Sequence, residues 1–347
     1  MHKFKKGFLT FLLLMVAIII SACGNSETAS SSENGNSNEI QEMTIKISHV
    51  VAENTPKHQA SLAMAEYIEE NSNGKITVQV YPNGQLFDDK TEVKNLRANN
   101  VQFIIPDMSK MVGMNPAFNI PALPFIFDSN EEAYAFWDGE TGQKILQSLE
   151  SEGIIGLRMW PNGPKHITNT VRPITGPEDL EGLKIRVQGG QVLAEIFKTV
   201  GAGPLQLPFG QLYTALEQGT VDGQVNTYSN ISTKKLGDVQ KYITTNWGAA
   251  RVDYALLTNK KFWNSMNEAT KEVVKAGIDH GTKQARTLAE ELNSEALKTI
   301  KERGKMEIHE LTTEERETLK EALQPVYDKF ADEIGKDVIK AAKNAGK

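Results

Sequence analysis

Arg186 is the side chain whose place in the sequence best suits it to bind a charged ligand. Apolar residues alternate in Leu183-Lys184-Ile185-Arg186-Val187, so a strand here would direct Arg186 away from the apolar face. Gly189-Gly190 and a helical pattern follow, which places Arg186 at the carboxyl end of the strand, where open α/β sheets bind ligands. A guanidinium there can hold a carboxylate through two parallel hydrogen bonds. A surface arginine on an edge strand would show the same spacing.

Patterns for catalysis or metal binding are missing from the sequence. It contains no G-x-S-x-G elbow, no phosphate-binding loop, no G-x-G-x-x-G after a strand and no H-E-x-x-H. A secreted hydrolase, the alternative from another class, would need a nucleophile and a base or a metal cluster. The sequence therefore predicts a binding protein that is not an enzyme and needs no cofactor or metal. The histidines beyond the N-terminal segment are scattered, without the spacing of metal ligands: His49, His58, His166, His280 and His309.

The N-terminus has the pattern of a lipoprotein signal peptide. A basic head at residues 2–6 precedes an apolar run at 8–20, which is too short for a comfortable membrane span of about 20 residues. Ile20-Ser21-Ala22-Cys23 resembles a lipobox, and Cys23 is the only cysteine of the chain. An ordinary signal peptide or a signal anchor is the alternative. The prediction is a signal peptide at 1–22, a lipid on Cys23 and a location on the outer face of the cytoplasmic membrane.

Composition separates a tether from a folded part. Residues 24–42 are mostly Ser, Asn, Glu and Gly, so 23–42 is predicted to be a lipidated, flexible linker. About 300 residues remain from Met43, more than one hydrophobic core usually organises, which favours two lobes. Loss of residues 1–22 removes three lysines and no acid, which takes the net charge from −6 to −9. Such a charge argues against nucleic acid as a partner.

Strand and helix patterns alternate along the folded part. This βα rhythm predicts a mostly parallel sheet with helices on its faces, and a second βα series after an irregular connector at 112–127 predicts a second lobe. The predicted strands are at 45–49, 76–80, 101–105, 154–160, 183–187 and near 205, and the helices begin at 55 and about 88 and cover 191–200 and 209–218.

A long helix is predicted near the C-terminus. No proline occurs from 267 to 303, and these residues would reach roughly 55 Å, enough to bridge two lobes. Gly277 and Gly281 could equally break the helix in two. Thr312-Thr313-Glu314-Glu315 is a capping box that would open a C-terminal helix.

Several motifs occur in a fixed order, and together they resemble the solute-binding subunit of a TRAP (tripartite ATP-independent periplasmic) transporter, in the group that binds C4-dicarboxylates and other organic acids. The resemblance covers roughly residues 43–332. The motifs are Asn83-Gly84-Gln85-Leu86, Leu123-Pro124-Phe125, Trp160 with Asn162-Gly163, Thr168-Asn169, the run Pro177–Val187, Pro208-Phe209, Leu212–Leu216, Val221-Asp222-Gly223-Gln224, Asn226 and Lys261-Phe262-Trp263.

The resemblance implies a two-lobed α/β fold of the periplasmic-binding-protein type, with hinge strands, a long helix spanning both lobes and a cleft that closes on a carboxylate. Lobe I would comprise 43–162 and about 250–290, and lobe II about 163–249 and 291–347. The partners implied are a small organic-acid anion and the membrane subunits of a TRAP transporter. The binding protein of an ATP-driven importer shares the two-lobed plan, and a sensor subunit that presents its ligand to a receptor kinase is a further alternative.

The resemblance also assigns candidate ligand-binding residues. It implies that Arg186 clamps the carboxylate, that Asn226 bonds the same group, that Phe209 forms a cleft wall and that Asp107 faces the distal part of the ligand. His49, in the first βα loop, is a weaker candidate.

Two positions depart from the pattern of this family. Lys165 stands where the family often has a second arginine, which replaces a planar fork with a point charge. Val225 replaces a polar residue of the motif that ends at Asn226. The change to Lys165 puts recognition of the distal part of the ligand in doubt, and because of both departures the sequence does not identify the acid.

Overall fold

The computed structural model describes residues 39–347. The predicted signal peptide, Cys23 and residues 24–38 of the predicted linker lie outside the described residues. The last linker residues contact the folded part: Ile40 packs against its core, and the Gln41 main-chain N–H donates to Thr270 Oγ1 at 2.9 Å. No helix in 39–347 has both the length and the apolar character needed to cross a membrane.

Lobe I is built around a five-stranded sheet of order β2-β1-β3-β10-β4. Its strands are β1 (Met43–Ser48), β2 (Ile76–Tyr81), β3 (Phe103–Ile104), β4 (Ile154–Pro164) and β10 (Arg251–Asn259). β1 is parallel to β2 and β3, whereas β10 is antiparallel to β3 and β4. The prediction of a mostly parallel sheet is therefore wrong for this half. The chain leaves the lobe along β4 and returns along β10, which makes these two strands antiparallel.

Lobe II is built around a six-stranded sheet of order β11-β9-β5-β8-β6-β7. Its strands are β5 (His166–Asn169), β6 (Lys184–Val187), β7 (Gly203–Gln206), β8 (Gly223–Asn226), β9 (Tyr242–Thr245) and β11 (Glu307–Glu310). β6 lies between β7 and β8 and is parallel to both. Arg186 is thus on an inner strand, and the alternative of a surface arginine on an edge strand is wrong.

Helices cover the sheets. In lobe I these are α1 (Pro56–Asn71), α2 (Glu92–Arg97), α3 (Asn130–Asp138), α4 (Glu140–Gln147) and α8 (Lys260–Ser265), and in lobe II α5 (Gln191–Thr199), α6 (Leu212–Glu217) and α7 (Tyr228–Thr233). Of these, α1, α2, α5 and α6 lie where the apolar patterns predict them, whereas α3, α4, α7 and α8 were not predicted. α2 begins four residues later than predicted. The Asp88 carboxylate accepts hydrogen bonds from the N–H groups of Lys90 and Thr91, which stabilises a turn before the helix.

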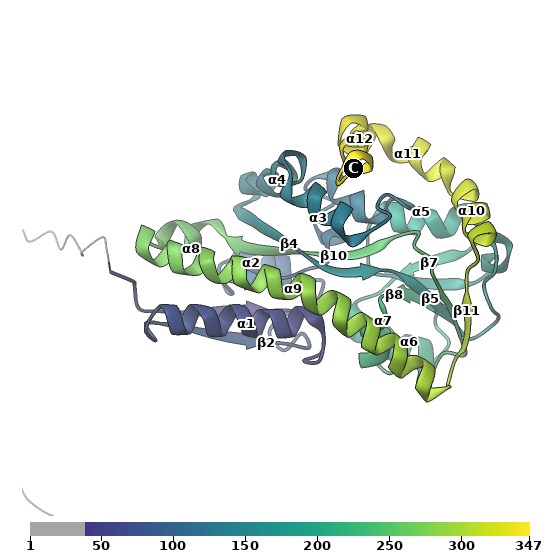
Figure 1. The fold of residues 1–347 in the computed structure, drawn as a ribbon, viewed down its shortest axis with the longest axis horizontal. Coiled ribbons are helices and arrows are strands. Elements are labelled where there is room, and N and C mark those ends of the chain that lie inside the picture. The colour runs from purple at the N-terminus through teal and green to yellow at the C-terminus, as the bar shows by residue number, and fades with distance from the viewer. Residues whose placement is uncertain (1–38) are drawn as a thin grey trace, which may run out of the picture. The chain divides into compact units, whose positions relative to one another are not determined.

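Helix α9 (Glu268–Arg303) is a single helix of 36 residues that packs on α1 and β4 in lobe I and on α7 in lobe II (Figure 1). Both lobes belong to one compact unit. Gly277 and Gly281 do not break α9. They lie where α9 packs on α1, and the absence of a side chain lets the two helices approach closely. A Cβ atom on Gly277 would lie 2.3 Å from Ile68 Cγ1, and one on Gly281 would lie 2.7 Å from Met64 Cβ.

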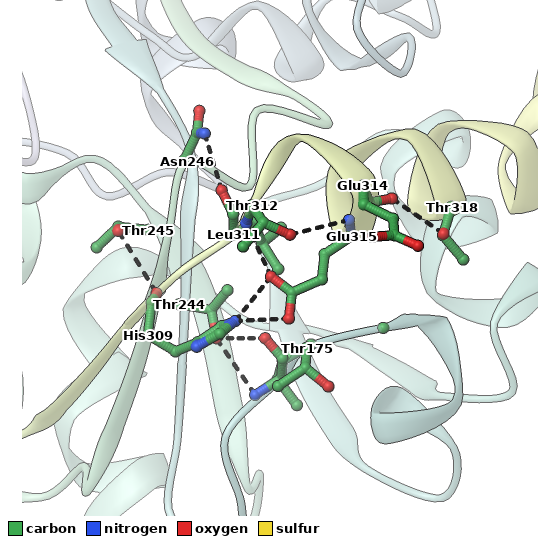
Figure 2. Close-up of polar contacts among 12 residues, drawn as sticks. Thr175, Thr244, Thr245, Asn246, His309, Leu311, Thr312, Glu314, Glu315 and Thr318 are labelled. Atoms are coloured by element: carbon green, nitrogen blue, oxygen red, sulfur yellow. Dashed lines mark hydrogen bonds and ion pairs between the residues drawn. The ribbon is translucent and has the colours of Figure 1, made fainter.

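The C-terminal segment forms three helices instead of the one predicted: α10 (Thr313–Ala322), α11 (Gln324–Ile334) and α12 (Lys336–Asn344). Pro325 begins α11, and Gly335 separates α11 from α12 with a φ of 102°. The predicted capping box is confirmed: Thr312 Oγ1 accepts from the Glu315 N–H, and the Glu315 carboxylate accepts from the Thr312 N–H (Figure 2). Helix α11 contacts α5 of lobe II, and α12 contacts α3 of lobe I.

Candidate ligand-binding site

A cavity with about 360 Å³ of empty space lies between the lobes. Lobe I contributes the loop after β1 and the first turns of α1 and α2, while lobe II contributes the segments that follow β6 and β7. Strand β10, which joins the lobes, supplies the third side. The lining residues are Val50, Val51, Lys57, Asp89, Glu92, Asp107, Lys110, Gln188, Phe209, Asn226, Asn230, Val252 and Tyr254.

Arg186 is fully buried beside this cavity but does not line it in this structure. Its Nε and Nη2 atoms both donate to the Leu207 carbonyl, at 3.0 and 2.8 Å, and Nη1 has no partner within the described chain. Burial lowers the pKa of Arg186 to about 10, and the nearby Asp89 and Asp107 limit that fall. The side chain therefore remains a cation at neutral pH, with one donor group left over. Its Cζ atom lies 5.9 Å from the centre of the Phe209 ring, which does line the cavity.

Asn226 lies at the end of β8, and its side-chain oxygen is already occupied. Oδ1 accepts from Asn230 Nδ2 at 2.7 Å and from the Thr227 N–H at 3.1 Å. The amide NH2 group is therefore the part of Asn226 that can meet an anion. Asn230 also donates to the Tyr254 hydroxyl at 3.4 Å, which links Asn226 to strand β10.

Two further hydrogen bonds join the lobes at the cavity. The Phe209 N–H of lobe II donates to Asp89 Oδ2 of lobe I at 3.0 Å. In the opposite sense, Lys110 Nζ of lobe I donates to the Gln188 carbonyl of lobe II at 3.0 Å, and it lies 3.6 Å from Asp89 Oδ2. The lobes are thus in contact across the cleft.

Lys57 and Glu92 line the cavity and were not predicted from the sequence. Lys57 Nζ donates to the Ile105 carbonyl at 2.7 Å and lies 3.6 Å from the centre of the Tyr254 ring. Burial lowers the pKa of Lys57 to about 8, against the opposing influence of Glu92 and Asp89, and burial raises the pKa of Glu92 to about 8. Both residues lie in the first turn of a helix at the carboxyl ends of parallel strands, so the rule that selected Arg186 could have found them.

The remaining ligand-binding candidates from the sequence differ in whether they reach the cavity. Asp107 lines the cavity, and its Oδ1 accepts from the Ser109 N–H at 2.9 Å. His49 is buried behind the wall, with Nε2 3.1 Å from His58 Nδ1, and burial holds its pKa well below the usual value. Lys165 is buried at the hinge, where Nζ donates to the Arg251 carbonyl, and burial lowers its pKa to about 8. The structure therefore brings Asn226, Phe209 and Asp107 to the cavity, with Arg186 next to it.

Over residues 39–347, no group of three or more His, Cys, Asp or Glu side chains is placed to hold a metal ion.

Two α/β lobes joined by hinge strands, with charged and polar side chains gathered in a cavity between them, define a solute-binding protein. The comparisons with known proteins identify the family. The model of bacterial extracellular solute-binding protein family 7 (DctP) matches residues 47–333, and the chain belongs to this family.

The names of similar proteins agree with this family assignment. The chain is 38% identical over 305 residues to the C4-dicarboxylate-binding periplasmic protein DctP of Rhodobacter capsulatus, which covers 87% of this chain and 91% of the relative. It is 35% identical over 299 residues to the C4-dicarboxylate-binding protein DctB of Bacillus subtilis, covering 86% and 85%.

Solved structures share the fold. A TRAP periplasmic solute-binding protein of Shewanella oneidensis with bound succinate matches with a TM-score of 0.85 and 38% identity over 88% of this chain and 99% of that chain. The sugar acid binding protein DctPAm of Advenella mimigardefordensis, in complex with galactonate, matches with a TM-score of 0.85 and 33% identity over 89% and 100%. The predicted two-lobed fold and the resemblance to TRAP solute-binding subunits are confirmed.

Proposed function

We propose that this protein captures a small carboxylate outside the cytoplasmic membrane and delivers it to the membrane subunits of a TRAP transporter. The observation that carries the proposal is Arg186, a buried cation beside the cavity whose Nη1 group has no partner in residues 39–347. A buried charge needs a counter-charge and satisfied hydrogen bonds, and a ligand carboxylate supplies both. The Asn226 amide is positioned to donate to the same carboxylate.

The class of acid follows from the relatives and from the charges of the site. Relatives are named for C4-dicarboxylates, and solved structures hold succinate or galactonate. Lys57 and Lys110 add two cations to the cavity wall, opposite the Arg186 side. A C4-dicarboxylate or a sugar acid is therefore the ligand class that we propose. Lys165 does not line the cavity, and its Nζ donates to the Arg251 carbonyl, so we propose no direct contact of Lys165 with the ligand.

The mechanism proposed is cleft closure. A carboxylate first held by Arg186 and Asn226 on lobe II would be enclosed when lobe I meets it, and the two cross-lobe hydrogen bonds of Asp89 and Lys110 would hold the closed form. Closure removes water from the carboxylate, so that its affinity depends on well-aligned donors.

Calorimetry on the mature protein tests the proposal. Protein unfolded and refolded to remove any carried ligand is titrated with succinate, L-malate and galactonate, and with a neutral polyol as control. Thermal unfolding is measured in parallel, because a ligand that binds the native state raises Tm as its concentration exceeds Kd. We expect at least one acid to bind and the polyol not to bind. Binding of the polyol with no response to any acid would contradict the proposal.

We also propose that Cys23 carries a lipid that holds the protein on the outer face of the membrane. The support is the sequence Ile20-Ser21-Ala22-Cys23 after a short apolar run. The Cys23→Ala variant should remain unprocessed or appear in the medium, whereas wild type should sediment with membranes. A Cys23→Ala protein that is processed and membrane-bound like wild type would exclude the lipid anchor.

A further inference from the structure

The carboxyl group of Glu92 lines the cavity and is buried without a paired charge. Glu92 is the first residue of α2 and is 1% exposed, and its Oε2 atom has no hydrogen-bond partner within residues 39–347. An ionised carboxylate in such a place would need a cation and several donors, because an unpaired buried charge costs much free energy. A neutral carboxyl group avoids most of this cost and carries one O–H donor.

The two lysines of the cavity wall are engaged elsewhere. Lys57 Nζ, on α1, donates to the Ile105 carbonyl at 2.7 Å. Lys110 Nζ, in the segment after β3, lies 3.6 Å from Asp89 Oδ2. Within residues 39–347, neither lysine is close enough to Glu92 to form an ion pair with it. The carboxyl group of Glu92 therefore lacks the partner that would keep it ionised.

The charges around Glu92 do not compensate for its burial. Burial raises the pKa of Glu92 to about 8; Asp89, just before α2, and Asp107, after β3, add to the rise, whereas Lys57 and Lys110 oppose it. Glu92 is thus mostly protonated at pH 7.

A bound anion would favour the protonated form of Glu92 further. Across the cavity, Arg186 of lobe II is a cation, and the Tyr254 hydroxyl of β10 stays neutral because burial raises its pKa. An acid held by Arg186 would share about 360 Å³ of empty space with the carboxyl groups of Asp89, Asp107 and Glu92. Like charges repel strongly where water is excluded. Protonation of Glu92 removes one of these repulsions and replaces an acceptor by a donor.

We propose that Glu92 holds a proton while an acid is bound and donates a hydrogen bond to it, so that capture of the acid is linked to uptake of a proton from solvent. This inference rests on the proposed function, because an anion must enter the cavity for the linkage to exist. Protonation and binding then favour each other. Affinity should fall as the pH rises, by at most about tenfold per pH unit for one proton, and should level off at low pH once the empty protein is also protonated at Glu92.

Calorimetry counts the protons directly. Wild type, stripped of ligand as above, is titrated at pH 8 with succinate, L-malate and galactonate in Hepes and in Tris. These buffers differ in ionisation enthalpy, so the difference in heat reports the protons exchanged on binding. For the most tightly bound of the three acids, we expect uptake of about half a proton or more and a fall in affinity of at least about threefold from pH 7 to pH 9. The three acids are ionised throughout this range, so the proton belongs to the protein.

Glu92→Gln separates Glu92 from the lysines of the site. Lys57 and Lys165 also have pKa values that burial lowers to about 8, and either cation could take up the same proton when an anion binds. Glutamine keeps a donor but does not titrate. Proton uptake at pH 8 should therefore fall by more than half in Glu92→Gln, and affinity should depend less on pH. Uptake and a pH profile equal to those of wild type would assign the proton to a lysine and overturn the inference.

Glu66→Gln is the matched control, because it removes the same kind of group from an exposed position on α1 that does not line the cavity. It should take up as many protons as wild type. Circular dichroism reports whether each variant is folded. If Glu92→Gln does not fold, infrared difference spectra of wild type at pH 8 decide, because a protonated carboxyl group has a C=O stretch that a lysine proton does not produce. Its absence on binding would overturn the inference.

The outcomes also separate this inference from the proposed function. An acid that binds wild type at pH 8 without proton uptake would overturn the inference alone, because a carboxylate would still be bound. Failure of all three acids to bind at pH 7 would instead count against the proposed function, and the inference would fall with it.

Discussion

The two walls of the cavity use their polar atoms differently. On lobe II, Arg186 is tied to the Leu207 carbonyl by two donors, and the Asn226 oxygen accepts two hydrogen bonds from its own lobe. What these side chains leave over is donors. On lobe I, the Asp89 carboxylate leaves Oδ1 without a partner in the described chain. Lobe II thus offers Arg186 and Asn226 to a carboxylate, although Gln188 Oε1 and Asn230 Oδ1 of the same lobe are also unpaired acceptors within residues 39–347.

This difference suggests a division of labour. Groups held rigidly by their own lobe bind a carboxylate with a similar free energy whatever else the ligand carries, because little reorganisation is needed on binding. Groups that remain unsatisfied until a ligand arrives penalise any molecule that fails to pair them. We infer that Arg186 and Asn226 anchor the ligand and that the unsatisfied groups of the cavity, foremost Asp89 of lobe I, decide which acid is retained.

The largest expected effect is on the anchoring wall. Arg186→Ala should weaken carboxylate binding by about 2–5 kcal/mol, because a desolvated carboxylate then lacks its charged partner. Arg186→Lys keeps the charge but loses the planar guanidinium, so its affinity should fall between those of wild type and Arg186→Ala. Calorimetry with the best-bound acid measures both.

Arg172→Ala is a suitable control for this prediction. Arg172 also belongs to lobe II and donates to the carbonyls of Asp179 and Glu181, but it does not line the cavity. Its replacement should leave affinity unchanged. An Arg186→Ala protein that binds as tightly as wild type would remove the basis for separating the two walls.

Sequence reasoning found the anchoring wall better than the selective one. The position of Arg186 could be predicted because strand alternation and the following glycines place it at a strand end. Both are local features of the sequence. Lys57 and Glu92 follow the same topological rule, but charged residues in the first turn of a helix are common on surfaces, and only tertiary contacts show that these two are buried.

Longer-range features were harder to predict. The antiparallel pairing of β4 with β10 joins residues 87 to 105 positions apart, from Arg251 with Pro164 to Asn259 with Ile154, and no local pattern encodes it. Whether Gly277 and Gly281 break the helix stayed open in the sequence, because their role depends on the surface of α1. The depths of Lys165 and His49 likewise follow from packing.

A substitution in the scaffold of lobe I, away from the cavity wall, should have a smaller effect, and this effect should be on stability and not on ligand affinity. Gly277→Ala places a methyl group 2.3 Å from Ile68 Cγ1, in a fully buried contact between α9 and α1. We expect a loss of about 1–3 kcal/mol in the free energy of unfolding, because overpacking forces neighbouring atoms to move. Ligand affinity of the folded protein should stay close to wild type. Denaturant unfolding and calorimetry measure the two quantities.

Gly113→Ala controls for the intrinsic change of residue, because a Cβ there has no neighbour within 4 Å. It should not destabilise the protein. A large loss of affinity in Gly277→Ala would mean that the packing of α9 on α1 and the selective wall are coupled, and that the scaffold and the site of lobe I are not separable.

The smallest expected effect concerns the contact between the walls. Lys110→Met removes the hydrogen bond from Nζ to the Gln188 carbonyl and keeps most of the apolar stem of a side chain that is only 12% exposed. Because the Lys110 charge is already paired with Asp89, the main loss is this single hydrogen bond, which contributes about 1 kcal/mol, so affinity should fall roughly fivefold. Because the bond forms only after the lobes meet, the loss should appear in the dissociation rate and leave the association rate nearly unchanged. Stopped-flow measurements with a displaceable ligand resolve the two rates.

Lys90→Met is the control, because Lys90 is the exposed neighbour of Asp89, and it should change neither rate. If Lys110→Met slowed association instead, Lys110 would act by attracting the anion to an open cleft, and the two walls would share the task of capture.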